Sequence, residues 1–308
     1  MLKSKRARRW AFFGGIVILL ATIAVARIGS RLAMMPDPNT PLTVMPVKDG
    51  IYWLRGGVSN TGFIVGKTSV TAIDAQMFPD TARNARRAIA SVTPKPVRSM
   101  IITHSDPDHV NGLTAYPAVT DTIAQVNARR DILEGLHSWR PSFTKPPSGL
   151  KHYLPIRVVQ TRTDLDIDGV RFQLLHFGPA HTDGDMIVYL PKQRVVFAGD
   201  ILTPEIGPFP GIHTEKNGSS LGWIRFVEEM LKLDADVFVS GHGMPMSVSE
   251  IRAGLVRAKQ RRAQVAALVA NKESLGSIKR ALNDQPLNGI ASMFPTFVET
   301  TYEELTRR

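Results

Sequence analysis

A stretch at positions 103–112 constrains this chain more than any other, because it places metal-capable side chains directly after a strand-like apolar run. Two imidazoles and two carboxylates occur within six positions there, namely His104, Asp106, Asp108 and His109. Imidazole and carboxylate together suit zinc, iron or manganese better than calcium or magnesium. Asp106 precedes Pro107 and is also a good helix N-cap, so the stretch by itself leaves ordinary polar loop chemistry open.

Composition sets wide limits on the rest of the chain. Its 308 residues allow one large domain or two small ones, and 43% hydrophobic residues can form a sizeable core. The absence of cysteine excludes disulfides, thiolate nucleophiles, cysteine-ligated zinc and iron–sulfur centres. The net charge of +11 falls to +6 without the five basic residues before position 10. Because the other basic residues are scattered or on a C-terminal helix, we expect no nucleic-acid partner.

The N-terminus predicts export. Residues 11–26 are uncharged and almost wholly apolar, follow five cations, and end in Ala24-Val25-Ala26, an A-x-A cleavage pattern. This run is shorter than the about twenty residues that a bilayer span needs. We therefore expect a signal peptide, or alternatively a membrane anchor over residues 10–26. In both cases the body of the protein is expected in the periplasm, free after cleavage near Ala26 or tethered to the inner membrane.

The first half of the chain predicts an antiparallel meander followed by β-α-β-α alternation. Strands are expected at 51–54, 61–65, 70–74, 99–103 and 122–126, and helices at 79–92, 108–116 and 128–136. Residues 36–46 are rich in proline and turn formers and suggest a linker. The stretch 137–155, which includes Trp139 and Phe143, is expected to be a lid or pocket wall, or equally a surface crossover.

The second half repeats this order of strands, helix and strand. Hairpins are expected at 163–177, around Asp168-Gly169, and at 186–199; a helix, a strand and two further helices follow at 219–233, 236–240, 249–272 and 274–282. Residues 283–308 carry no clear pattern. Two β-rich halves with outward helices predict two sheets packed face to face beneath helical layers.

Three further titratable residues come after strand-like runs and beside glycines, namely His181, Asp200 and His242. Each alone is more often a loop, turn or buried structural residue than a functional one. Together with the first cluster they make seven nitrogen and oxygen ligands from four loops. That number suits two metals with one shared carboxylate.

Four motifs resemble those of the metallo-β-lactamase superfamily: H-x-D-x-D-H, G-x-x-H-T-x-G-D, A-G-D and S-G-H-G, in this order over residues 45–245. The resemblance implies an α+β fold, a four-layer αββα sandwich with the metal site at the open edge between the sheets. The implied organisation is a signal peptide or anchor at 1–26, a linker at 27–45, this domain at 46–248, and a C-terminal helical extension of the same domain at 249–308.

The resemblance also assigns roles residue by residue. It implies that the first metal is held by His104, Asp106 and His181, and the second by Asp108, His109 and His242. Asp200 falls at the bridging carboxylate, and Asp74 at a residue that supports the site from outside. Structural positions of the family are matched by Asn60, Thr61, Gly62, Thr182, Gly184 and Asp185.

Asp106 departs from the usual family motif, H-x-H-x-D-H. Three interpretations are open. In the first, Asp106 ligates a metal, as a carboxylate does at this position in flavo-diiron proteins. In the second, it only caps a helix and leaves effectively one metal. In the third, the whole site is inactive. We favour the first of these interpretations. Two divalent metals are expected, zinc first, with iron or manganese as alternatives because of Asp106.

The expected reaction is hydrolysis of an ester, thioester, lactone or amide of a small molecule by a hydroxide held at the metals. Asp108 would orient the hydroxide and pass a proton to the leaving group. β-Lactamase activity is not favoured, since Asp200 resembles the glyoxalase II and lactonase branches. The alternatives are a diiron redox protein of the same fold and a metal-poor, non-catalytic binding module. His213 is a weak pocket candidate and is expected to be a surface histidine.

Overall fold

The computed structural model describes residues 40–117, 121–137, 146–147, 149–154, 157–287 and 294–307. These residues belong to one unit that spans Pro38–Arg308. The expected signal peptide or anchor at 1–26 lies outside the described residues, as do Trp139 and Phe143, so their interpretations stay predictions. No helix within the described ranges is both long enough and apolar enough to cross a bilayer.

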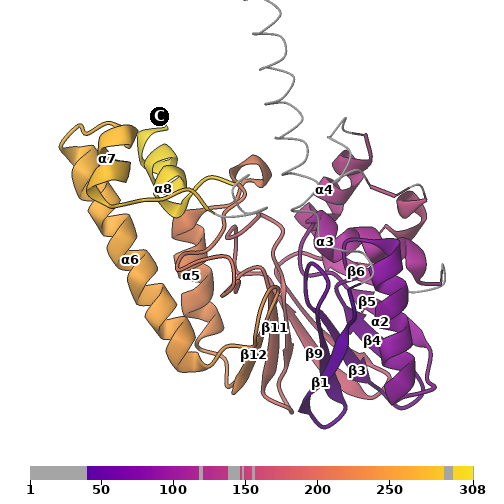
Figure 1. The fold of residues 1–308 in the computed structure, drawn as a ribbon. Helices are drawn as coiled ribbons and strands as arrows, with labels where there is room; N and C mark the ends of the chain where they lie inside the picture. Colours follow the sequence, from indigo (N-terminus) through magenta and orange to yellow (C-terminus); the bar gives the residue numbers. More distant parts are fainter. Residues whose placement is uncertain are drawn as a thin grey trace, which may run out of the picture. The chain divides into compact units, whose positions relative to one another are not determined.

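The described strands form two sheets that pack face to face (Figure 1). The first has the order β1 (Thr43–Lys48), β2 (Ile51–Arg55), β3 (Thr61–Val65), β4 (Val70–Ile73), β5 (Val97–Ile101), β6 (Asp121–Gln125) and β7 (Arg157–Val159). The second has the order β12 (Val237–Ser240), β11 (Val195–Gly199), β10 (Ile187–Leu190), β9 (Val170–Leu175) and β8 (Arg162–Ile167).

Each sheet contains a parallel pair that directs loops to one edge. β4 pairs with β5 in parallel, and β11 pairs with β12 in parallel. A parallel connection needs a crossover, and helix α2 (Pro79–Val92) and helix α5 (Ser220–Met230) supply it. Helix α5 begins where the Ser219 hydroxyl accepts the Gly222 N–H at 3.0 Å. The loops after β5, β11 and β12 are among those expected to carry ligands, and the loop after β4 carries Asp74.

Helices cover the outer face of both sheets, which makes four layers and confirms the αββα prediction (Figure 1). On the first sheet lie α2, α3 (Pro107–Val110), the 3₁₀ segment η1 (Asn111–Ala115) and α4 (Val126–His137). On the second lie α5, α6 (Val248–Ala270) and α8 (Phe297–Thr306), with α7 (Leu275–Ala281) beside α6 and α8. Short 3₁₀ segments also occur at η2 (Leu150–Tyr153) and η3 (Thr214–Lys216).

The inner core between the sheets is built from alternate strand residues. Trp53 and Ile101 of the first sheet belong to the same buried cluster as Phe172 and Phe197 of the second. The ring of Phe197 lies over Gly62, where a Cβ would come within 2.3 Å of it. Only glycine therefore allows the two sheets to approach this closely at the end that carries the candidate ligands.

Three differences from the sequence-based expectations concern short or edge elements. The expected linker at 27–45 ends before Thr43, because β1 starts there and pairs with β2. The unpatterned residues 283–308 contain α8, which Thr296 caps and which packs on α5 and α6. The helix expected at 108–116 becomes 3₁₀ at Asn111. Gly112 there fits so tightly against Ala75 that a Cβ would lie 1.9 Å from its carbonyl oxygen.

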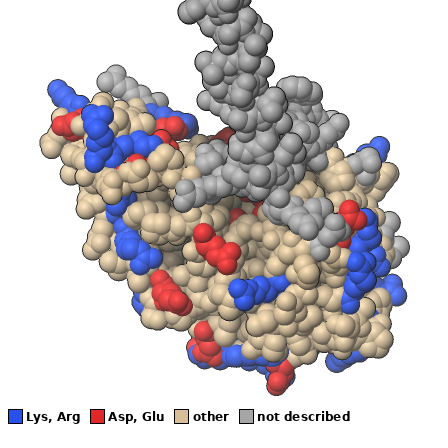
Figure 2. Space-filling view, in the orientation of Figure 1, with Lys and Arg blue, Asp and Glu red and all other residues tan. Residues whose placement is uncertain are grey.

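Charged side chains on the face shown in Figure 2 form separate groups, with acidic and basic residues interleaved and uncharged surface between them. The view covers one face of the molecule. The expectation that no nucleic acid binds therefore stays a prediction.

Phe226 tests the packing of the outer layer on the second sheet. Its ring is fully buried on α5 and meets Phe177 edge-on at 5.1 Å between centroids. We expect Phe226→Ala to lower the free energy of unfolding by about 3–5 kcal/mol, because it leaves a cavity. Val256→Ala on α6, where the residue is 51% exposed, is the control and should change it by less than about 0.5 kcal/mol. Urea denaturation measures the free energy of unfolding of both variants. Equal losses in the two variants would contradict the packing described.

Candidate metal centre

The seven predicted ligands converge at one edge of the sandwich. They follow β5, β9, β11 and β12, so both sheets contribute. Their donor atoms fall into three overlapping groups, each with all atoms within 4.8 Å of one another: His104, Asp106 and His181; His104, His109 and Asp200; and Asp108, His109 and His242. The structure thus brings together every residue that the sequence assigned to a metal.

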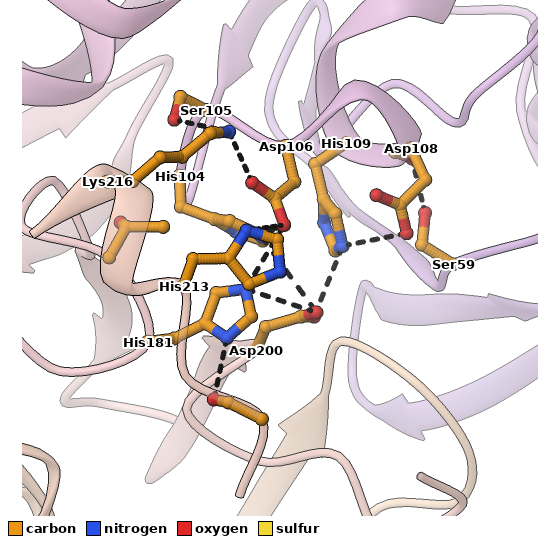
Figure 3. A network of polar contacts seen from close by, with 12 residues as sticks. Ser59, His104, Ser105, Asp106, Asp108, His109, His181, Asp200, His213 and Lys216 are labelled. Atoms are coloured by element: carbon orange, nitrogen blue, oxygen red, sulfur yellow. Dashed lines mark hydrogen bonds and ion pairs between the residues drawn. The ribbon is translucent and has the colours of Figure 1, made fainter. Parts of the chain in front are cut away.

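Distances within the groups show how the carboxylates face the imidazoles (Figure 3). Asp106 Oδ2 lies 3.1 Å from His181 Nε2 and 3.6 Å from His104 Nε2. Asp108 Oδ2 lies 3.1 Å from His242 Nε2. His109 Nε2 lies 3.5 Å from the same Asp108 oxygen. The contacts therefore outline two groups of three side chains, one around Asp106 and one around Asp108, which the overlapping group of His104, His109 and Asp200 connects.

Asp200 lies between the two groups. Its Oδ1 is 3.2 Å from His109 Nε2, and its Oδ2 is 3.2 Å from His242 Nε2 and 3.8 Å from His181 Nε2. One carboxylate therefore faces histidines of both groups. This is the position that a shared ligand requires.

Several donor atoms at the centre are buried without a hydrogen-bond partner among the described residues. They are His104 Nε2, His109 Nε2 and Asp200 Oδ1. A buried polar atom left unpaired costs about 1–3 kcal/mol, and a bound cation removes that cost by taking the lone pairs. Four imidazoles and three carboxylates are also a suitable donor set for divalent transition metals. The residues present therefore fit the metals that the family implies.

The histidines are oriented from behind through Nδ1. His109 Nδ1 lies 2.8 Å from Asp74 Oδ2, and His181 Nδ1 lies 2.9 Å from the Gly211 carbonyl oxygen. A proton held on Nδ1 leaves the Nε2 lone pair directed at the centre. Asp74 itself is fixed by the amide and the hydroxyl of Thr103, both at 2.8 Å. Asp74 thus occupies the supporting position expected from the sequence.

Glycine and Asn60 fix the loop that carries His242. At Gly241 a Cβ would lie 1.9 Å from Asp200 Oδ1, so only glycine lets this carboxylate reach the centre. The backbone N–H of Asn60 donates to Gly241 at 2.7 Å, and its side-chain amide donates to the carbonyls of Ser240 and Gly243 at 2.9 and 2.8 Å. One residue of the first sheet thereby holds a ligand loop of the second.

The family-type residues around His181 are structural. Asp185 accepts the N–H and the hydroxyl of Thr182 at 2.9 and 2.7 Å, which closes the loop. Gly184 lies against the backbone of Ala128, where a Cβ would come within 2.4 Å. These residues shape the loop, and the side chain of His181 reaches the centre.

Asp106 occupies the N-cap position of α3, but its side chain makes no capping hydrogen bond. The carboxylate instead faces the centre through Oδ2 and receives Lys216 Nζ on Oδ1 at 2.5 Å. Lys216 Nζ also donates to Ser105 Oγ at 3.1 Å (Figure 3). The sequence reasoning missed Lys216, because a single lysine in a polar loop carries no signal of burial.

His213 was expected to be a surface histidine, and that expectation is wrong. The residue is only 4% exposed, with its ring against His181 and Phe294 at centroid distances of 4.4 and 4.0 Å. Its Nδ1 lies 3.5 Å from Asp106 Oδ2. Burial, reinforced by the positive charge of nearby groups, outweighs Asp106 and lowers the pKa of His213 to about 3.

Mutual attraction shifts the pKa values of six ligands toward their charged forms, namely Asp106, Asp108, Asp200, His109, His181 and His242. Burial alone would raise the pKa values of Asp106 and Asp200, but neighbouring cationic groups hold both well below the usual range. Burial alone would lower the histidine values, but Asp106 raises the pKa of His181 to about 9. Asp200 and Asp108 raise that of His242 to about 10. Without metal, the centre is therefore a cluster of opposed charges.

Comparison with known proteins agrees with this geometry. The family model of the metallo-beta-lactamase superfamily matches residues 54–242. The chain is 32% identical over 222 residues to 2,4-dinitroanisole O-demethylase subunit alpha of Nocardioides sp. (strain JS1661), covering 69% of this chain and 61% of that protein. It is 22% identical over 224 residues to a linear primary-alkylsulfatase of Pseudomonas sp. (strain ATCC 19151), covering 58% and 40%. The chain thus spans less than two thirds of either relative.

Solved structures agree on the fold. The sec-alkylsulfatase Pisa1 of Pseudomonas sp. superposes with a TM-score of 0.66 at 17% identity, covering 86% of this chain and 50% of that one. A metallo-β-lactamase of Hirschia baltica superposes with a TM-score of 0.58 at 16% identity, covering 71% and 98%.

Asp74→Asn tests the support of His109. Asparagine keeps the side-chain shape and tolerates the left-handed backbone at this position, where φ is +60°. It removes the charge behind Nδ1, so we expect metal affinity at the group of His109 to fall about 10–100-fold. Competition with a chromophoric chelator measures the affinity. Asp164→Asn on the surface of β8 is the control, and equal affinities for the two variants would argue against the role of Asp74.

The metal-free protein is expected to lose stability as the pH rises. Folding raises the pKa values of His181 and His242 from 6.5 to about 9 and about 10. Their contribution is therefore complete below about pH 6.5 and is lost as the pH rises through the two folded values. Urea unfolding in the presence of chelator, at several pH values between about 6 and 10, measures this. The decline should be shallower in His242→Gln, and a flat profile in the parent protein would refute the charge arrangement.

Proposed function

This chain belongs to the metallo-β-lactamase superfamily, and we propose that it is a metal-dependent hydrolase that uses two divalent metal ions. One observation carries the proposal: seven ligand side chains from both sheets converge at one place, and among them are buried imidazole and carboxylate atoms with no hydrogen-bond partner among the described residues. Zinc is the proposed metal. Iron and manganese are the alternatives, because a carboxylate at position 106 suits harder ions than a third histidine does.

The proposed ligand sets follow the groups described above. His104, Asp106 and His181 would hold the first metal, and Asp108, His109 and His242 the second, with Asp200 shared. When bound, such a pair supplies a water of lowered pKa as the nucleophile and polarises the bond to be cleaved. The chain's own residues then orient the reactants and move protons.

Asp108 is the residue best placed for proton transfer. Its side chain is 18% exposed, compared with 7% for Asp106 and 5% for Asp200. Its Oδ2 faces His242 and His109, and the Ser59 hydroxyl fixes its backbone carbonyl at 2.5 Å. In the proposed mechanism it accepts the proton of the attacking water and returns it to the leaving group.

The relatives suggest which substrates to test first. Two are named as alkylsulfatases and one as an O-demethylase of 2,4-dinitroanisole. In a sulfate ester or an aryl ether, the bond to be cleaved joins an oxygen to a sulfur or carbon centre. We therefore propose small substrates in which an oxygen atom is bonded to the sulfur or carbon atom at the cleaved bond. Alkyl sulfates are to be tested first, with lactones, thioesters and β-lactams as the comparison set.

Metal content is the decisive measurement. Protein purified without added metal is expected to carry two zinc ions per chain by elemental analysis, and exhaustive chelation should abolish hydrolysis. Two iron ions together with an absence of hydrolysis would instead favour a redox protein of the same fold. An absence of metal together with an absence of hydrolysis would overturn the proposal and leave the non-catalytic binding module.

Asp108→Asn tests the proton-transfer role. We expect kcat to fall at least about 100-fold, because the amide cannot accept the proton, while one metal remains on His104, Asp106 and His181. Steady-state kinetics and metal analysis of the same preparation measure both effects. Glu205→Gln, in the neighbouring loop, is the control. An Asp108→Asn variant with unchanged kcat would contradict this role.

A further inference from the structure

Lys216 is a buried cation placed behind the one atypical ligand. Its side chain is 8% exposed and that of Asp106 is 7% exposed, and Nζ lies 2.5 Å from Asp106 Oδ1. The other carboxylate oxygen, Oδ2, faces His181 Nε2 at 3.1 Å. A single carboxylate therefore separates a fixed positive charge from the place of the first metal.

The backbone holds Lys216 rigidly in this position. Its N–H donates to the His213 carbonyl at 3.0 Å, and its own carbonyl accepts the Asp183 N–H at 2.9 Å. Two residues further on, a Cβ on Gly218 would lie 2.2 Å from the His181 carbonyl oxygen. The loop of Lys216 is thus packed directly on the backbone of a ligand residue, which fixes the point from which the side chain reaches Asp106.

The free-energy cost of burying this lysine indicates that it has a role besides folding stability. Lysine is almost never fully buried unless it is paired, and a buried ion pair is seldom more stable than apolar residues of the same size. Ser105 supplies only one further acceptor for the ammonium group. Folding stability alone therefore does not explain why this lysine lies here.

We infer that Lys216 is a positioning residue that makes Asp106 electrostatically equivalent to a neutral ligand. By occupying Oδ1 it leaves only Oδ2 for the metal, and its positive charge cancels that of the carboxylate. The pair would present to the first metal the same net charge as the histidine usual at position 106. This inference rests on the proposed two-metal site.

The inference predicts an order of affinities at the first site from net charge alone. Lys216→Met leaves an uncompensated carboxylate and should bind zinc at least tenfold more tightly than the parent. Asp106→His leaves an uncompensated ammonium group and should bind at least tenfold more weakly. The double variant Asp106→His/Lys216→Met restores the net charge and should return to within about threefold of the parent.

Zinc competition titrations on the full chain give the two dissociation constants, and the one lost in His181→Ala identifies the first site. A second readout is the thermal midpoint of the chelated protein. It should fall in Lys216→Met, where buried Asp106 loses the ammonium group on Oδ1 and keeps only the histidines that face Oδ2. Lys216→Arg keeps the charge and should preserve the parent affinity. Lys232→Met, at an exposed lysine paired with Glu229, is the control and should change neither quantity.

The outcomes separate the inference from the function on which it rests. A parent protein that binds no metal at the first site overturns the proposed two-metal hydrolase and the inference with it. A parent with two metals whose Lys216→Met variant binds zinc equally or more weakly overturns the inference alone. Should Lys216→Met not fold, Lys216→Gln, which keeps a hydrogen-bond donor without the charge, gives the same comparison.

Discussion

The structure depends on charge compensation among buried groups. An isolated carboxylate removed from water costs several kcal/mol, and four are buried or nearly so at one edge of the sandwich. Each faces a group that carries or can carry a proton: Asp74 faces His109, Asp106 faces His181 and Lys216, and Asp108 and Asp200 face His242. Each carboxylate is thus compensated by the group that it faces.

Strand topology explains why the cluster forms at this edge. Parallel pairing of β4 with β5 and of β11 with β12 brings the carboxyl ends of those strands to the same side. Strands β4 and β11 are buried along their whole length, so their apolar residues are fully used in packing. The titratable side chains of the centre enter the interior just beyond the ends of these strands, where Asp74, His104, Asp200 and His242 lie.

The placement of titratable residues directly after buried strands made most of the site predictable from the sequence. An apolar run followed by a titratable residue and a glycine is visible in the chain itself. Lys216 and His213 were not predictable in this way, since their burial depends on a loop folding over His181. Edge strand β1 lacked a distinct pattern for a different reason, since none of its residues is fully buried. Helix α8 did carry a signal, because Thr296 and Glu299 have the spacing of a capping box.

Asn60 has a consequence for how such a chain tolerates change. Apolar contacts between the sheets have no preferred direction, so they permit small sliding movements when core residues are exchanged. Three hydrogen bonds from Asn60 to Ser240, Gly241 and Gly243 are directional and lie beside His242. These hydrogen bonds hold the two sheets in one relative position beside His242. The sheets can shift against each other far from Asn60, while their displacement near it stays small. The interior can therefore drift in evolution without separating the two halves of the centre.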